Sequence, residues 1–124
     1  MARTATQGTA IAGNLALESV VLALPGITVQ AGSPVDLIGE VDVTEGATGT
    51  AVTLRLRRGA DQTGILLATF GPVALAAAAR TVLGVQWRDT QNVDVAGQQY
   101  VLTMQQTGAT VNGTANTASL RADY

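Results

Sequence analysis

The sequence predicts an all-β protein: a jelly-roll β-sandwich, or a related sandwich, of about eight antiparallel strands with a flexible N-terminal arm. Three observations support this fold class. Short runs rich in β-branched residues follow one another along the chain. Segments rich in Gly and Pro separate these runs. Within several runs apolar and polar residues alternate, as expected when one face of a strand is buried and the other is solvated.

The first segment, residues 1–14, reads MARTATQGTAIAGN and contains one Arg and no apolar run. We therefore predict a flexible arm over 1–14, which either frays or becomes ordered on a partner, and a single jelly-roll domain over 15–124. A secretory signal needs an apolar stretch of about seven residues or more, so we expect no signal peptide. No stretch approaches the roughly 20 apolar residues of a membrane span.

From residue 15 onward, short apolar runs predict strands at Leu15–Leu24, Ile27–Val29, Val35–Thr44, Thr50–Arg58, Ile65–Phe70, Thr81–Arg88, Tyr100–Gln106 and Thr114–Tyr124. The turns predicted between them are Pro25-Gly26, Gly32-Ser33-Pro34, Glu45–Gly49, Arg58–Gly64, Gly71-Pro72, Asp89–Gln99 and Thr107–Gly113. The alanine-rich segment Val73–Arg80 could form one helical turn, because Ala has the highest helix propensity. Pro72 and Gly84 bound it and it lacks an apolar stripe, so extended chain or a loop is favoured.

The composition argues against an enzyme before any motif is considered. The chain has no Cys, no His and no Lys, and its 7 basic residues are all Arg against 9 acidic residues, for a net charge of −2. Without these residues there is no thiolate metal site, no Ser–His triad, no Schiff-base lysine and no P-loop. We therefore expect no catalytic residues, no metal ligands and no cofactor.

The best candidates for a functional cluster are three acidic residues on one predicted strand face. Asp36, Glu40 and Asp42 alternate with apolar residues in Val35–Val43. Arg55 and Arg57 alternate in the same way in the following strand. If the two strands pair as a hairpin, the acidic row lies opposite the arginine row, because core face must meet core face.

This arrangement leaves three interpretations of the carboxylates. Cross-strand charge pairs on a solvated face are the favoured one. A calcium site is the second, since calcium takes oxygen ligands, but the spacing has no EF-hand signature. An acid/base pair for glycoside hydrolysis is the third. An enzyme that uses carboxylates alone would draw on Asp36, Glu40 and Asp42, or on Asp89 and Asp94.

The two C-terminal strands also alternate, which predicts a second hairpin. With a loop at Thr107–Gly113, Tyr100 would lie near Leu120 and Leu102 near Ala118. The last strand runs to the final residue, so we expect the C-terminus to be built into the sheet.

Other residue patterns give weak functional signals. Only Phe70, Trp87, Tyr100 and Tyr124 are aromatic, too few for the stacking platforms of sugar or single-strand nucleic-acid binders. Arg55, Arg57 and Arg58 form the only basic cluster, and a net charge of −2 does not favour binding to phosphate backbones. Asn112-Gly113-Thr114 matches a glycosylation acceptor, but Asn-Gly is first a turn former.

Two longer segments resemble a known family. Thr50–Gly64, TAVTLRLRRGADQTG, combines an aliphatic–Arg strand, an Arg-Gly turn and a second aliphatic strand. Tyr100–Tyr124, YVLTMQQTGATVNGTANTASLRADY, combines a Tyr-x-Leu strand, a Thr-Gly-rich loop and a final strand of small residues. Both resemble small jelly-roll proteins of tailed bacteriophage virions, which are similar to tumour necrosis factor-like and complement-globular-head domains. The resemblance implies a trimeric capsid decoration, head-fibre or tail-associated protein.

We therefore expect a non-enzymatic virion structural protein, a homo-oligomer that is a trimer by the resemblance. Its partner would be the major capsid protein or another virion protein, with no nucleic acid and no membrane, and its location the virion, assembled in the host cytoplasm. A hydrophobic content of 47% with 13% charged residues also predicts that subunit contacts cover part of the surface. The alternative is a glycan- or host-surface-binding module that uses loops at one end of the sandwich, with Trp87 as the residue to test.

Overall fold

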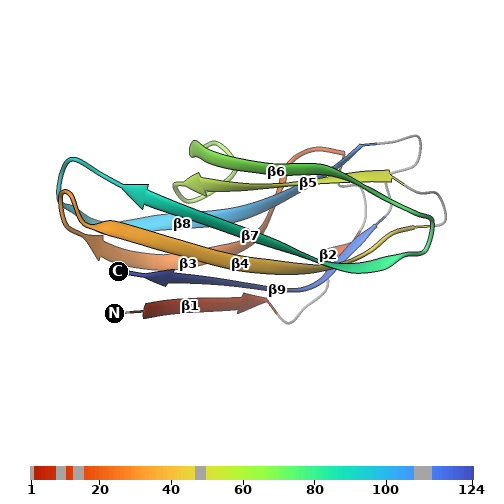
Figure 1. Cartoon of the computed structure of the whole chain (residues 1–124), viewed down its shortest axis with the longest axis horizontal. Helices are drawn as coiled ribbons and strands as arrows, with labels where there is room; N and C mark the ends of the chain where they lie inside the picture. The colour runs from red at the N-terminus through yellow and green to blue at the C-terminus, as the bar shows by residue number, and fades with distance from the viewer. Residues whose placement is uncertain (1, 8–10, 13–15, 47–49, 108–112) are drawn as a thin grey trace.

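The computed structural model describes residues 2–7, 11–12, 16–46, 50–107 and 113–124. These residues form nine β-strands: β1 (Ala2–Gln7), β2 (Ile11–Ala12), β3 (Ser19–Val29), β4 (Pro34–Thr44), β5 (Thr50–Arg58), β6 (Ile65–Leu75), β7 (Arg80–Thr90), β8 (Val95–Thr107) and β9 (Thr114–Asp123). The strands lie in two sheets packed face to face (Figure 1). No helix in this part of the chain is long and apolar enough to span a membrane.

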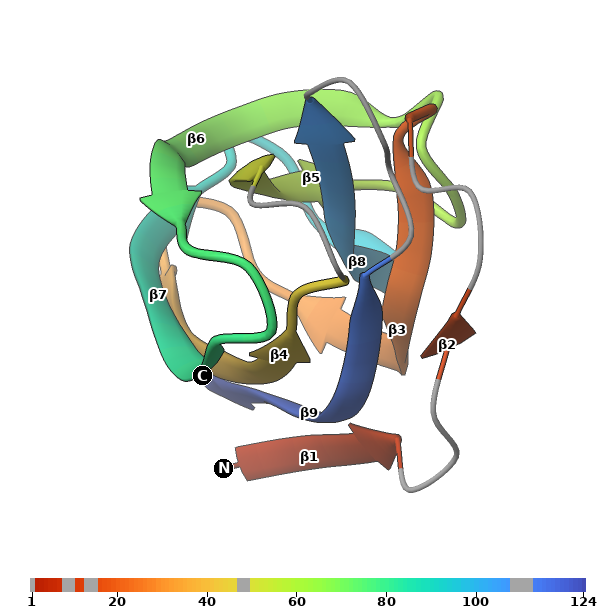
Figure 2. The same ribbon diagram turned by 90° about the vertical axis from the view of Figure 1, so that its right-hand side faces the viewer.

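The order of the strands is that of a jelly roll. One sheet has the order β1-β9-β4-β7, with β2 also on β9, and the other has the order β3-β8-β5-β6. Every strand pairing is antiparallel. From β3 to β9, consecutive strands lie in opposite sheets except for the β5–β6 hairpin, and Figure 2 shows the two sheets enclosing the core between them. The predicted all-β jelly-roll sandwich is confirmed.

The alternation of side chains predicted for the strands is also present. In β4, Val35, Leu37, Val41 and Val43 are buried, and in β5 Val52, Leu54 and Leu56 are buried. Strands β8 and β9 complete the core with Tyr100, Leu102, Met104, Leu120 and Ala122. The strand containing Leu120 lies between β1 and β4, so the C-terminal segment is built into a sheet as expected.

Both predicted hairpins are wrong. Strand β4 pairs with β7 and β9, while β5 pairs with β6 and β8 in the other sheet. Strands β8 and β9 likewise lie in opposite sheets. Tyr100 pairs with Leu24 of β3 and Arg58 of β5, whereas Leu120 pairs with Gly39 of β4. The physical reason is that a strand with one buried face fits equally well beside the preceding strand or opposite it in the other sheet. Apolar faces of consecutive strands meet the core whether the strands are neighbours in one sheet or face each other across the sandwich.

Several predicted turns lie inside strands. Pro25 and Gly26 fall within β3, where the register with β8 shifts between Leu24 and Ile27. Gly71 and Pro72 fall within β6, where the register with β5 also shifts. Gly71 has a φ of 107°, and a Cβ there would lie 2.7 Å from the carbonyl oxygen of Val52. Gly and Pro therefore mark β-bulges here rather than chain reversals.

The remaining boundaries differ at the strand ends. The predicted loop Asp89–Gln99 shrinks to residues 91–94, because β7 and β8 extend into it. The segment Val73–Arg80 contains no helix: β6 continues to Leu75, and the amide of Ala79 donates to the carbonyl of Ala76 in a turn. Extended chain and a turn, which the sequence favoured there, are confirmed.

The segment predicted as an arm, residues 1–14, contains β1 and β2. Both pair with β9, and β1 does so over six consecutive residue pairs from Ala2 opposite Asp123 to Gln7 opposite Ala118. β1 therefore supplies the outermost strand of its sheet (Figure 2). Flexibility of this segment, and its separation from the domain over 15–124, stay predictions.

Candidate functional site

Two of the three candidate carboxylates on β4 are held by arginines of β7. Asp36 accepts from Arg88 Nε at 2.7 Å and from Nη2 at 3.1 Å. Asp42 accepts from Arg80 Nε at 3.1 Å and from Nη2 at 2.6 Å. These hydrogen bonds from the guanidiniums lower the pKa of both carboxyls below its ordinary value. Cross-strand charge pairs therefore exist, but their arginines come from β7 rather than from the predicted Arg55 and Arg57.

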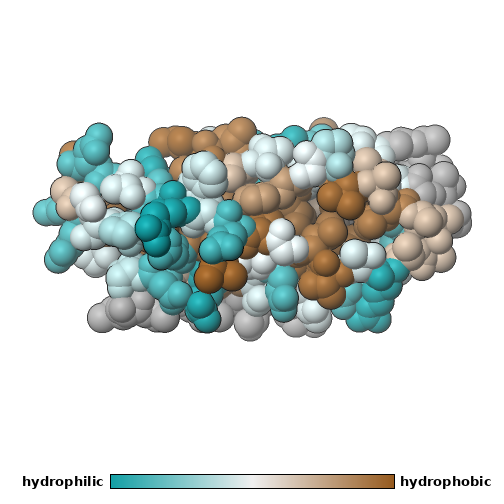
Figure 3. Space-filling model, in the orientation of Figure 1, coloured by the Kyte–Doolittle hydropathy of each residue, from teal (hydrophilic) through white to brown (hydrophobic). Residues whose placement is uncertain are grey.

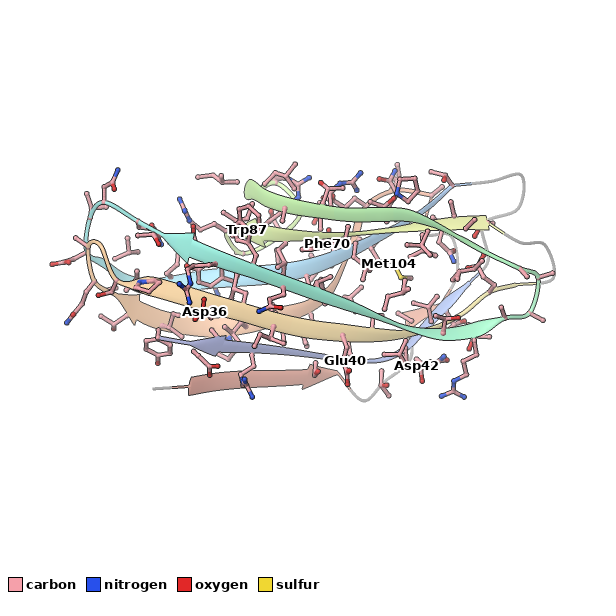
Figure 4. All side chains as sticks on the ribbon, in the orientation of Figure 1. Asp36, Glu40, Asp42, Phe70, Trp87 and Met104 are labelled. Carbon is pink, nitrogen blue, oxygen red and sulfur yellow. The ribbon has the colours of Figure 1, made fainter. Side chains whose placement is uncertain are left out.

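The third candidate, Glu40, is exposed on the same sheet face. It lines a shallow hollow of about 290 Å³ together with Ile38, Gly39, Ser119 and Arg121. In the part of the chain that the structure describes, no three Asp or Glu side chains gather in a group that could hold a metal ion. Figure 4 shows Asp36 set apart from Glu40 and Asp42 along the sheet. Among the described residues, the three carboxylates of β4 therefore do not gather into a ligand set for calcium.

Asp89, a candidate for the carboxylate-only enzyme, instead joins the two sheets. Its side chain is only 5% exposed, and it accepts from both Nε (3.0 Å) and Nη2 of Arg58. The hydroxyl of Tyr100 donates to the same carboxylate at 2.8 Å. Burial and this hydrogen bond raise the pKa of Tyr100 above its ordinary value. Asp89 lies in one sheet and its two partners in the other, so the group is a structural clamp.

The other candidate of that pair, Asp94, lies in the turn between β7 and β8. Its carboxylate accepts from the backbone amide of Ala31 at 2.8 Å, which ties this turn to the β3–β4 turn. Asp89 and Asp94 thus serve separate contacts and converge on no common point.

The basic cluster is neutralised within the chain. Arg55 and Arg57 both bind Glu18, at 3.0 Å and 2.8 Å respectively, while Arg58 binds Asp89. Burial disfavours ionisation of Glu18, but the two guanidiniums outweigh it and hold its pKa below the ordinary value. Glu18 precedes β3, so this network fixes the start of that strand on the outer face of the sheet. No sequence pattern pointed to Glu18.

A second buried polar group was also missed by sequence reasoning. Glu45 is 4% exposed at the end of β4, and its carboxylate accepts from Thr50 Oγ1 and from Gln106 Nε2. The amide of Gly113 donates to Gln106 Oε1 at 3.1 Å. The side chains of Thr50 and Gln106, which donate to Glu45, are both neutral. These hydrogen bonds link the ends of β4, β5 and β8 beside β9. Asn112, of the glycosylation-like motif, lies outside the described residues.

Another hollow lies at the end of the sandwich near the β3–β4 turn. It has a volume of about 500 Å³ and is lined by residues 26–30, 33–35 and Tyr124. Its lining holds no carboxylate side chain and no arginine. None of the predicted candidates, including Trp87, contributes to it.

A different surface stands out by its apolar character. Eight large hydrophobic side chains are exposed among the described residues, and five of them lie on β6 and β7. We call these five residues on the two end strands the β6–β7 flank: Ile65, Leu66, Val73, Val82 and Trp87. They do not all face the same way, because Val82 pairs with Asp42 on the outer face of one sheet and Leu66 pairs with Arg57 on the outer face of the other. β6 and β7 are the end strands of their respective sheets, and apolar surface gathers over them in Figure 3.

Trp87 shows why this flank is open. It shares the inward-facing parity of Val85 and Asp89, which are both buried, yet it is 42% exposed. Figure 4 shows Trp87 on β7 and Phe70 on β6, on the side of the sandwich where the two end strands pass each other. Core-directed side chains therefore reach the surface here, because no further strand in the described chain closes the space between the sheets.

Comparison with known proteins identifies the fold. No protein-family model matches the sequence, and no curated protein matches it. The chain is similar to solved structures of infectious bursal disease virus particles. A T=1 particle matches with a TM-score of 0.66 and 11% identity, and the match covers 99% of this chain and 32% of that chain. The T13 particle matches with a TM-score of 0.65 and 10% identity, and the match covers 99% of this chain and 31% of that chain. A VP2 subviral particle matches with 0.59 and 12% over 98% and 37%.

This chain therefore spans about a third of the length of the virus-particle chains it matches. At such low identity the likeness shows a shared jelly-roll fold and nothing of a shared activity. A family 35 carbohydrate-binding module from Clostridium thermocellum matches with a TM-score of only 0.40.

Proposed function

We propose that this chain is a non-enzymatic structural protein of a virion that acts through protein–protein assembly. The observation that carries the proposal is the jelly roll itself, since almost the whole chain superposes on part of virus-particle proteins. The exposed apolar side chains of the β6–β7 flank support it, because protein contacts would remove them from water.

In its finer form, the proposal is a homotrimeric subunit of a tailed bacteriophage, attached to the major capsid protein or another virion protein as a capsid decoration, head fibre or tail component. It would be assembled in the host cytoplasm and located in the virion. The support is the resemblance of residues 50–64 and 100–124 to small phage jelly-roll proteins.

The candidate carboxylates favour this function over an enzyme. Asp36, Asp42 and Asp89 each bind an arginine of their own chain, and Asp94 binds a backbone amide. A general acid or a nucleophile needs a free carboxyl beside a substrate cleft. These contacts instead use the carboxylates to hold strands together.

The setting of Trp87 favours protein contact over glycan binding. A sugar platform combines an aromatic ring with hydrogen-bonding side chains around it. The other exposed large hydrophobic side chains on β6 and β7 are all aliphatic, and aliphatic side chains suit protein contacts better than a sugar platform.

The test is fractionation of virus particles from infected cells on a density gradient, with an antibody against this chain. The protein should sediment with intact particles and stay bound through a wash at about 1 M salt, because apolar contacts are not screened. Its presence only in the particle-free fractions would contradict the proposal. Glycan-array binding that Trp87→Ala abolishes would support the glycan-binding alternative instead.

A further inference from the structure

We propose that the outer edge of β7 binds an extended segment of another protein, which adds to this sheet as a further strand and covers core-directed side chains that are now exposed. The inference rests on the proposed assembly role, and it names the surface and the chemistry of the partner. Three features carry it: uncovered side chains that face the core, a free main-chain edge and the absence of charge along it.

Side chains that face the core are left uncovered along β6 and β7. Trp87 pairs with Leu37, and Val73 pairs with Val52, so each points to the same interior as its partner. Leu37 and Val52 are fully buried, whereas Trp87 is 42% and Val73 39% exposed. Four of the six partly buried hydrophobic residues that pack against the core also lie on these two strands: Leu67, Phe70, Leu75 and Leu83. The core is therefore incompletely covered on this side of the sandwich.

The opposite side of the sandwich is covered. β3 is also an end strand, and β1 lies against it there. Leu24, Ile27 and Val29 nevertheless face the core from β3 and are at most 2% exposed. An end strand does not by itself leave the core open, so the exposure along β6 and β7 is a particular property of that side.

β7 offers a free and regular main-chain edge beside these side chains. Among the described strands it pairs only with β4, over its whole length and without a register shift. The amides and carbonyls along its other edge have no strand partner, and an extended chain satisfies such groups by adding to the sheet. β6 is less suited, because its edge is interrupted by the bulge at Gly71 and Pro72. The occupant that fits is therefore a strand, and β7 is its partner.

The absence of charge along both strands sets the chemistry of this occupant. β6 contains no charged residue, and β7 contains none from Thr81 to Trp87. A charge on the added strand would lie beside the core without a counter-ion, which is costly. The segment is therefore uncharged over this stretch. Its apolar residues stand at every second position, because alternate side chains of a strand face the core.

The segment comes from a chain that does not use it to fill a core of its own. In a second copy, strands such as β4 already bury their apolar side chains in their own sandwich. Residues 1–14, which the sequence predicts as an arm, hold only Met1 and Ile11 as large apolar residues and show no alternation. An extended segment of a different protein supplies what these lack.

The first test uses yeast-displayed random peptides of about ten residues as the probe, with the full chain as bait. Enriched peptides should be uncharged and should alternate β-branched or aromatic residues with small polar ones. Enrichment of charged peptides, of peptides without alternation, or of none at all would overturn the proposal.

Trp87 then reports where a selected peptide without Trp binds, because it is the only Trp in the chain. Its fluorescence emission should move to shorter wavelength as it is covered. Trp87→Thr should weaken binding at least about tenfold, and Trp87→Phe should keep most of it. Val93→Thr is the matched control, since Val93 is 62% exposed but lies in the turn between β7 and β8. With melting unchanged, equal binding by Trp87→Thr and Val93→Thr would refute the site.

N-methylation of the selected peptide tests strand pairing itself. Successive amides of a strand point to opposite edges, so methyl groups on every second residue block one edge only. One of the two alternate methylated series should lose binding and the other should keep it. Equal effects of the two series would show that the main chain is not the contact, and would contradict strand addition.

These experiments separate the two proposals. A selected peptide that binds this edge of a protein that never sediments with virus particles would keep the strand site and overturn the virion role. Sedimentation with particles that neither the peptide nor Trp87→Thr weakens would keep the virion role and overturn the strand site. Self-association that the peptide displaces would make a second copy the occupant and overturn the assignment to a different protein.

Discussion

The clamp between Asp89, Arg58 and Tyr100 allows a quantitative prediction. Asp89→Asn keeps the size of the side chain but removes its charge. The guanidinium of Arg58, only 22% exposed, then loses its counter-ion, and the hydroxyl of Tyr100 competes with it for a single carbonyl oxygen. The clamp joins β7 of one sheet to β5 and β8 of the other, so the substitution weakens the contact between the sheets.

Removing one partner of a buried ion pair costs about 3–5 kcal/mol. Arg58 keeps some contact with water, so we expect the low end, about 3 kcal/mol. For a chain of this length, each kcal/mol lowers the Tm by roughly 4 °C, and the Tm of Asp89→Asn should fall by about 12 °C. Tyr100→Phe removes one hydrogen bond and should cost about 1 kcal/mol.

The assay is thermal unfolding followed by circular dichroism at pH 7, with urea unfolding to obtain the free energy of unfolding directly. Asp36→Asn is the matched control, because the same substitution there breaks a pair that is 37% and 67% exposed. Its Tm should stay close to that of the parent protein. If Asp89→Asn and Asp36→Asn lower the Tm equally little, the clamp does not hold the sheets together and the reasoning is refuted.

Three further predictions concern acid stability, packing and the C-terminal strand. The pKa of Glu18 is lower in the folded state, so the carboxylate stabilises the fold fully above its unfolded-state pKa, and this stabilisation is lost as pH falls through its folded-state pKa. Glu18→Gln should therefore flatten the fall of Tm between about pH 5 and pH 3, and an unaltered pH profile would contradict this. Gly26→Ala should destabilise, since its Cβ would lie 2.9 Å from the Cα of Gly97, whereas Gly84→Ala, with no atom closer than 3.9 Å, should leave the urea midpoint unchanged; equal midpoints would show that the backbone can relax. Deletion of residues 120–124 removes the buried Leu120 and Ala122 from a central strand and should abolish cooperative unfolding; unchanged melting of the truncated protein would be inconsistent with the role of β9.

Local sequence patterns predicted the elements well where they depend on one strand alone. The alternation in residues 35–43 correctly placed Val41 in the core and Asp42 on the outer face. Gly26 and Gly71 were misinterpreted as turn residues, since Gly permits a bulge as readily as a reversal. Trp87 has core parity, and its exposure could not be predicted because it depends on β7 being the end strand of its sheet.

For the candidate carboxylates, too, the sequence predicted what one strand determines but not what depends on distant strands. Their presence on one face of β4, and their pairing with arginines, could be predicted from alternation and composition. Their partners could not, since Arg80 and Arg88 lie 38 and 52 residues along the chain from Asp42 and Asp36. Glu18 and Glu45 carry no local signal, because Glu18 is bound by arginines of β5 and Glu45 by Gln106 of β8 as well as by the nearby Thr50.

The sequence by itself determined that this protein is all-β, which face of an alternating strand such as β4 turns to the core, and that few charges are available for chemistry. These properties follow from composition and from the two-residue period of a strand. Only the tertiary structure decided which strands are neighbours, which charges meet, and that β6 and β7 end their sheets with an apolar flank exposed. The physical reason is that a strand's alternation is the same whether its partner lies beside it or across the core, so pairing is decided by the packing of the whole chain.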